Sequence, residues 1–149
     1  MTRNVLRARS FAGAENGIVS GWPQILLRLE GLSVLIASSV SYAWYGGSWW
    51  LFAALFFLPD LSMAGYLAGR RTGAASYNLV HWYVLPLACI TWAVLAQSTS
   101  FLNVGLIWAA HIGFDRGLGY GLKYPEGFGV SHLGLMGKAK RSAKRAHRL

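Results

Sequence analysis

Apolar residues fill the middle of the chain in four stretches separated by short polar links. Each stretch is about twenty residues long, which is the length of helix that crosses the hydrocarbon core of a bilayer. The expected spans are residues 26–44, 49–68, 75–96 and 101–118. The pattern therefore predicts an all-α protein, a polytopic integral membrane bundle of four transmembrane helices.

The links between these spans are so short that consecutive helices are expected to be antiparallel neighbours. Links 46–48 and 97–100 carry no charge, whereas link 69–74 carries Arg70 and Arg71, and both tails are basic. Positive charge collects on the cytoplasmic side of membrane proteins. We therefore expect an N-in/C-in protein, with a basic cytoplasmic N-terminal segment at 1–24, a transmembrane domain at 25–124 and a polybasic cytoplasmic tail at 125–149.

Aromatic and small residues refine this arrangement. Five aromatic residues surround the first link and are expected to anchor the bundle at the outer interface: Tyr42, Trp44, Tyr45, Trp49 and Trp50. Glycines at four-residue spacing, at 65 and 69 and at 113, 117 and 121, predict helix faces that pack closely on neighbours. For the last group the alternative is that glycines 117, 119 and 121 loosen the helix into a loop.

Composition agrees with a membrane protein. Hydrophobic residues make up 54% of the chain and charged residues 13%, against about 25% charged in ordinary soluble domains. The formal net charge is +9, and most of the basic residues that produce it lie outside the spans. We therefore expect these residues to orient the protein in the membrane rather than to bind nucleic acid. The single cysteine, Cys89, lies in an apolar stretch and excludes a disulfide framework.

Ionisable residues inside the spans call for an explanation, because their transfer into lipid is costly. The chain has only five acidic residues, and Glu30, Asp60 and Asp115 lie in or at the edge of predicted spans, as do His81 and His111. Counting about 1.5 Å per residue from the outer ends places all five in one layer in the cytoplasmic half of the bilayer. Four helices are thus expected to contribute to a polar interior there.

This set of side chains suits a divalent cation such as zinc, manganese or iron. His111 and Asp115 share one helix face, as do Tyr77 and His81. We expect His81, His111, Asp115 and Asp60 as metal ligands. In an enzyme acting on a lipid or other amphiphile, Glu30 would be the general base, with Asp60 and Ser62 as further catalytic residues.

Other interpretations stay open at this point, including whether the protein is an enzyme. The buried charges can pair with each other or with Arg28 and Arg116 and only hold helices in register. They can also move protons or a solute. The protein can instead be a non-enzymatic accessory subunit of a larger membrane complex, in which His81 or His111 binds a haem or a chlorophyll-type pigment.

Several motifs together resemble one known family. They are Leu27-Arg28-Leu29-Glu30-Gly31, Leu58-Pro59-Asp60-Leu61-Ser62-Met63, Tyr77-Asn78-Leu79-Val80-His81, His111-Ile112-Gly113-Phe114-Asp115-Arg116 and Gly119-Tyr120-Gly121-Leu122-Lys123-Tyr124-Pro125. Across residues 26–134 the chain resembles the bacterial membrane family called domain of unknown function 4260. The resemblance implies the fold and a bacterial inner membrane, and it implies no reaction. A looser similarity to multi-span zinc hydrolases is what suggests Ser62.

The C-terminal tail is strongly basic. A polybasic segment beside a membrane binds anionic lipid headgroups, at about 1 kcal/mol for each residue near the surface. Helical spacing of several of these residues favours a surface helix. The residues expected to contact lipid are Lys138, Lys140, Arg141, Lys144, Arg145 and Arg148.

Overall fold

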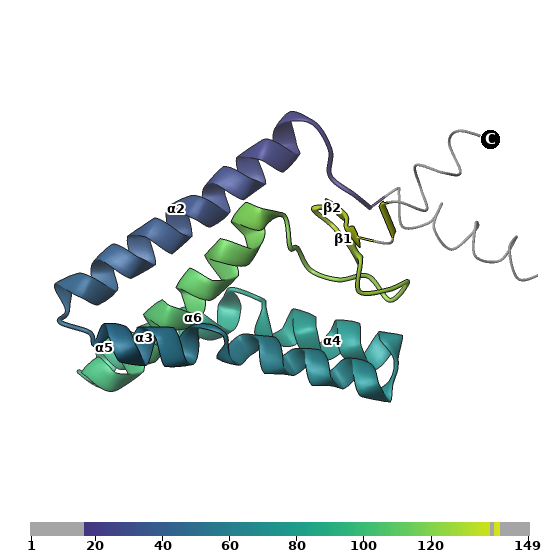
Figure 1. Ribbon diagram of the computed structural model, residues 1–149. Helices are drawn as coiled ribbons and strands as arrows, with labels where there is room; N and C mark the ends of the chain where they lie inside the picture. The colour runs from purple at the N-terminus through teal and green to yellow at the C-terminus, as the bar shows by residue number, and fades with distance from the viewer. Residues whose placement is uncertain (1–16, 138, 141–149) are drawn as a thin grey trace, which may run out of the picture.

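The structure is a computed structural model that describes residues 17–137, 139 and 140 (Figure 1). This part of the chain is mostly helical and ends in a short two-stranded hairpin. Three of its helical segments are long and apolar enough to cross a membrane, namely Trp22–Trp44, Trp49–Ala68 and Arg70–Leu95. The elements are α2 (Trp22–Trp44), α3 (Trp49–Phe56), the 3-10 helix η1 (Leu58–Ala68), α4 (Arg70–Val80), α5 (Val84–Leu95), α6 (Thr99–Leu118), β1 (Val130–Ser131) and β2 (Gly134–Leu135).

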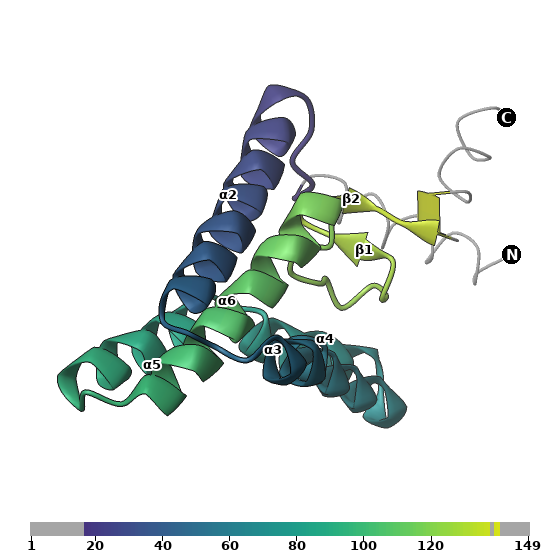
Figure 2. The ribbon, with the colours of Figure 1, turned by 60° about the vertical axis from the view of Figure 1, so that its left-hand side comes forward.

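The helices form two antiparallel pairs that cross each other. One pair is α2 with α6, and the other is η1 with α4, the helix that returns after the link at residue 69. Helix α6 also packs on α5 and α3, so it lies at the junction of the two pairs (Figure 2). Both views show the pairs diverging toward the end at which the hairpin β1–β2 lies.

Helix α6, which corresponds to the fourth predicted span, differs from the other three. It has 20 residues, but it is not among the segments apolar enough to be recognised as a span on hydropathy alone. From Gly105 to Asp115 nearly every residue is buried by other helices. Because its neighbours cover it, α6 can carry His111 and Asp115 without exposing them to lipid.

Proline interrupts two of the three long segments. Pro59 cannot donate a backbone hydrogen bond, and there the α-helix α3 passes into η1, in which the Asp60 amide bonds to the carbonyl of Phe57. The predicted span 75–96 is likewise two helices, which are separated at residues 81–83 just before Pro86. Long 3-10 stretches inside helices are uncommon and often mark functional sites. Asp60 and His81 lie at these two breaks.

Small residues allow the closest helix contact, as the glycine spacing predicted. A Cβ atom added to Gly113 would lie 2.6 Å from the carbonyl oxygen of Gly31 on α2, and one added to Gly117 would lie 2.5 Å from Leu32. Gly119 has a φ of 93° and ends α6 in the left-handed conformation, which glycine adopts without strain. Gly117 is therefore part of the packed helix, whereas Gly121 lies beyond its end.

The aromatic cluster near the first link only partly matches the predicted belt. Trp44, Trp49 and Trp50 are exposed, as interface anchors would be. Tyr42 is completely buried, and its hydroxyl donates a hydrogen bond of 2.6 Å to the carbonyl of Ser48. Its ring packs on Trp49 and Phe52, so Tyr42 fastens the turn between α2 and α3 instead of facing lipid.

Residues 119–137 fold back onto the helices, and we call them the cap. Val130 and Leu133 are almost fully buried. The carbonyls of His132 and Leu133 accept hydrogen bonds from the backbone of Val19 and the side chain of Gln24. The folded part thus continues past residue 125, at which the sequence pattern placed the start of the tail.

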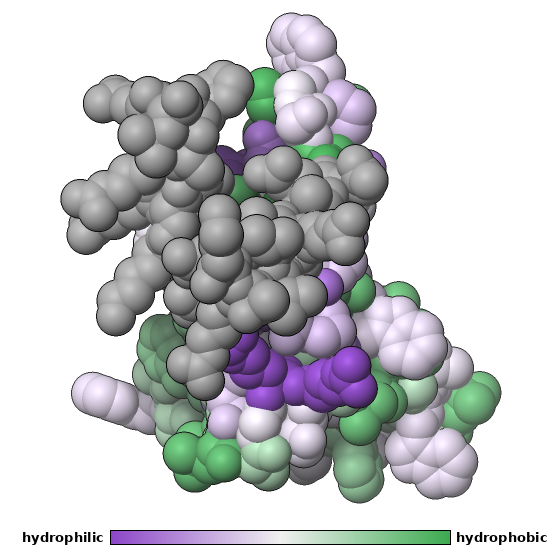
Figure 3. All heavy atoms as spheres, turned by 90° about the vertical axis from the view of Figure 1, so that its right-hand side faces the viewer, coloured by the Kyte–Doolittle hydropathy of each residue, from purple (hydrophilic) through white to green (hydrophobic). Residues whose placement is uncertain are grey.

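Most of the predicted lipid-binding tail lies outside the described residues. Lys140 is described and is exposed. Figure 3 shows the face on the right-hand side of Figure 1, where strongly polar residues gather between apolar ones in the lower half of the view. Outside the described part are residues 1–16, Lys138, Arg141, Lys144, Arg145 and Arg148.

Candidate metal centre

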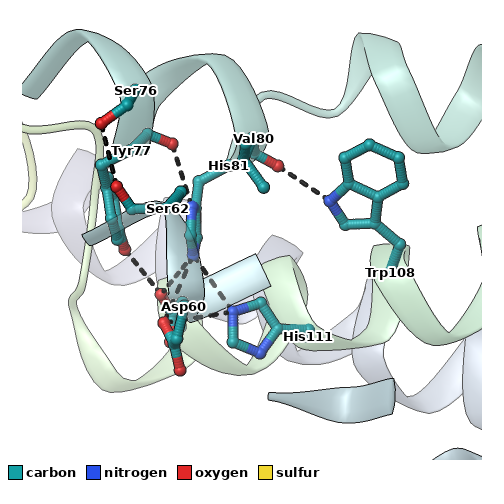
Figure 4. A network of polar contacts seen from close by, with 9 residues as sticks. Asp60, Ser62, Ser76, Tyr77, Val80, His81, Trp108 and His111 are labelled. Carbon is teal, nitrogen blue, oxygen red and sulfur yellow. Dashed lines mark hydrogen bonds and ion pairs between the residues drawn. The ribbon is translucent and has the colours of Figure 1, made fainter. Parts of the chain in front are cut away.

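Four ionisable side chains from three helical segments converge in the interior. Asp60 lies on η1, His81 directly follows α4, and His111 and Asp115 lie on α6. One potential ligand atom from each lies within 4.8 Å of all the others (Figure 4). The structure thus brings together the four residues predicted as metal ligands, from three helical segments rather than from all four predicted spans.

The ring of His81 is fixed in position and in tautomer. Its Nδ1 lies 2.9 Å from the carbonyl oxygen of Tyr77, and a carbonyl can only accept, so Nδ1 carries the proton. The ring also stacks on that of Tyr77, with 3.7 Å between centroids. The lone pair of Nε2 therefore points into the cluster, in the arrangement typical of histidine ligands to metals.

His111 faces His81 across the site. The two Nε2 atoms are 3.1 Å apart, and both rings are at most 3% exposed. Phe56 packs edge-on against the His111 ring. Two imidazole nitrogens at this distance need either a proton or a cation between their lone pairs. The edge of a tetrahedron of nitrogen ligands around zinc is about 3.3 Å, so the spacing fits a shared ion.

The two carboxylates complete the set with different surroundings. Asp60 Oδ1 lies 3.6 Å from both histidine Nε2 atoms, and its side chain is 30% exposed. Asp115 Oδ2 lies 3.6 Å from His81 Nε2 and accepts a hydrogen bond of 2.6 Å from the Tyr77 hydroxyl. Asp115 is thus oriented from behind, as ligating carboxylates are, while Asp60 forms the open side of the site.

The two remaining predicted catalytic residues, Glu30 and Ser62, are not among these four potential ligands. Glu30 is exposed on α2 and is not in the cluster. Ser62 is one of the polar residues of η1; its carbonyl accepts a hydrogen bond from Ser76, and its own hydroxyl is buried with no partner among the described residues. Glu30 is therefore not one of the side chains that converge in this cluster.

Lys123 is a buried charge that no sequence pattern marked as a site residue. Only 3% of it is exposed, and its ammonium lies over the rings of Tyr77, Tyr120 and Phe128. Burial lowers its pKa to about 8, although the charges of Asp115 and Asp60 raise it. The sequence feature that could have indicated this burial is the position of the lysine within an aromatic-rich motif after the last span.

A family model describes most of this chain. The model for the domain of unknown function DUF4260 matches residues 24–136. The chain belongs to the DUF4260 family. The match begins near the start of α2 and ends with the cap, so the DUF4260 domain includes both the helices and the hairpin. No curated protein and no solved structure matches the chain.

Proposed function

We propose that this DUF4260 protein is a membrane metalloenzyme that hydrolyses an amphiphile. His81, His111 and Asp115 hold a divalent transition-metal ion, zinc above all, and Asp60 acts as the general base. The observation that carries the proposal is the convergence of four ligand atoms within 4.8 Å in a buried site. Three protein ligands with an open position are typical of catalytic zinc.

The geometry favours a single ion over a larger cofactor. The two histidine Nε2 atoms face each other at 3.1 Å, which leaves no space for a porphyrin between them. Imidazole and carboxylate together match zinc, manganese and iron, and the described residues contribute no thiolate to the cluster. The cluster is therefore a poor haem or pigment site and a good site for a compact cation.

Asp60 is assigned as the base because it lies on the accessible side. Its neighbours Leu58 and Leu61 are more than half exposed, so a molecule that reaches Asp60 passes apolar side chains. In a membrane these side chains contact acyl chains. This surrounding supports a substrate with a hydrophobic part.

The reaction follows from these positions. The bound ion would polarise the scissile group and lower the pKa of water. Asp60 takes a proton from the attacking water, and the water oxygen forms a bond to the carbonyl carbon or the phosphorus of the substrate. The bond from that centre to the leaving oxygen or nitrogen then breaks, and the protonated Asp60 returns the proton to the leaving group.

The orientation of the protein rests on charge and on contacts within the described chain. Arg70, at the link between η1 and α4, contacts the carbonyl of Glu126 in the cap at 3.5 Å. The cap also bonds to Val19, just before α2. These segments therefore share one end, and their arginines and lysines support placing that end in the cytoplasm of a bacterium, against the anionic headgroups of its inner membrane.

Elemental analysis of the full chain purified in mild detergent tests the proposal directly. We expect about one equivalent of zinc, manganese or iron per chain after reconstitution. His81→Ala and His111→Ala should each abolish it, while His132→Ala, which lies outside the cluster, keeps it. Hydrolysis of lipid esters should follow metal content. A wild-type protein that takes up none of the three metals overturns the proposal.

A further inference from the structure

Lys123 presents an unusual problem of charge. Its ammonium is buried and has no hydrogen-bond partner among the described residues, and no carboxylate in that part of the chain forms an ion pair with it. An ammonium has three donors to satisfy, and leaving a buried charge without an acceptor is costly. Cation–π contacts offset only part of this cost.

The position of Lys123 is nevertheless well fixed. Its backbone amide donates to Asn78 Oδ1 at 2.6 Å, and the Asn78 amide group donates to the Lys123 carbonyl at 2.9 Å. These two bonds attach the cap to α4 next to Tyr77. The backbone of Lys123 is thus held by a side chain of α4, which fixes the point from which the lysine side chain projects, as a recognition residue requires.

One aromatic ring joins this ammonium to the metal centre. Tyr77 lies 5.0 Å below the ammonium, measured to its ring centroid, and its hydroxyl bonds to Asp115. The other two rings around the ammonium, Tyr120 and Phe128, are more than a third exposed. The three rings around the ammonium therefore have the candidate metal centre on the side of Tyr77 and are partly open to the outside at Tyr120 and Phe128.

We propose that the Lys123 ammonium is the anion subsite of this centre and that it binds the phosphate or carboxylate of an anionic amphiphile. The inference rests on the proposed function and narrows its substrate class. An oxyanion would supply the missing acceptors, and hydrogen bonds to ionised groups are among the stronger ones. The acyl chains would remain among the exposed apolar side chains beside Asp60.

The binding test compares three amphiphiles with identical acyl chains. Dioctanoyl phosphatidate carries a phosphate, dioctanoylglycerol hemisuccinate a carboxylate, and dioctanoylglycerol no charge. Calorimetric titration of the full chain should give about tenfold or greater preference for at least one anionic lipid over the neutral one. The anionic lipid that binds more tightly than the neutral one shows whether the subsite accepts a phosphate or a carboxylate. Equal affinity for all three lipids overturns the subsite.

Variants assign that preference to Lys123. Lys123→Met should lose this preference, and Lys123→Arg, which keeps the charge, should retain it. Lys123→Gln serves in place of Lys123→Met if the apolar variant does not fold. A preference that persists in the folded neutral variant overturns the proposal.

Metal content measured on the same samples separates the two proposals. A preference that depends on Lys123 in protein that never takes up metal would retain the anion subsite and reject the metalloenzyme. If the protein takes up metal but the lipid preference does not change in the Lys123 variants, the metalloenzyme proposal is retained and the anion subsite is rejected.

Discussion

The Tyr77 hydroxyl donates a hydrogen bond of 2.6 Å to Asp115 Oδ2. Tyr77→Phe removes this bond but keeps the ring that stacks on His81. We expect metal affinity to fall about 10- to 100-fold, as for other losses of a group that orients a ligand. Competition with a chelator measures it. Tyr83→Phe is the matched control, because the Tyr83 hydroxyl has no partner among the described residues. Equal affinity in the two variants would contradict the role of Tyr77.

The two carboxylates should respond differently to neutralisation. Asp60→Asn should keep the metal and lose hydrolysis by about 100-fold or more, since a general base typically contributes that much. Asp115→Asn should lose both the bound metal and hydrolysis. Metal content and turnover of a lipid ester are measured side by side. Equal loss of metal in both variants would make Asp60 a ligand and leave the base unassigned.

The contact between α2 and α6 depends on having no side chain at Gly113. In Gly113→Ala the new Cβ would meet backbone atoms of Gly31 and Leu35 within 2.7 Å, so the helices must separate. We expect a loss of about 1–3 kcal/mol of stability, the usual cost of overpacking, in detergent unfolding experiments. Ala37→Val adds volume at an exposed position of α2 and should change little. Equal stability of both variants would contradict the close contact.

The cap should loosen in mild acid. Burial, with a smaller contribution from the Arg116 charge, lowers the pKa of His132 below its ordinary value of 6.5. Its Nδ1 accepts a hydrogen bond from the Leu122 amide at 2.9 Å. The unfolded cap therefore binds more protons, so its stability is complete above pH 6.5 and falls as the pH drops below that value.

Hydrogen exchange of peptides from the cap, corrected for intrinsic rates, measures this effect. Protection should be lower at pH 5.5 than at pH 7.5, with α2 as an internal reference, and His132→Asn should reduce the difference. Protection that is independent of pH would contradict it.

Membrane orientation can be read from cysteine labelling. In a Cys89→Ser background, Ser48→Cys and Ser100→Cys lie at the two links expected outside, and Arg71→Cys lies at the link expected in the cytoplasm. An impermeant maleimide should label the first two in spheroplasts and the third only after lysis. The opposite pattern would reverse the orientation.

Hydropathy predicted much of the fold from the sequence. Three of the four predicted spans coincide with long apolar helical segments. The spacing of His111 and Asp115 predicted a shared face, because helical geometry alone decides it. The interruptions at Pro59 and Pro86 were not predicted, since prolines in membrane helices are often tolerated without a break.

Contacts between distant segments were beyond the sequence. Counting depth placed Glu30 in the same layer as the cluster, but depth does not specify which way a residue faces, and Glu30 faces outward on α2. Lys123 follows the last helix, where a lysine normally lies in solvent. Its burial depends on Asn78, 45 residues earlier in the chain, and no local pattern records that pairing.

The cap has a consequence for how the protein is assembled. Its partners are Val19, Gln24 and Asn78, which are all synthesised before it. The helices must therefore already be inserted and paired before the cap can dock. Lys123 becomes buried only in this last step, so the chain completes the wall of its site after the rest of the protein has entered the membrane. A polypeptide truncated before residue 119 would keep all four potential ligands and leave uncovered the side of the site on which the cap lies.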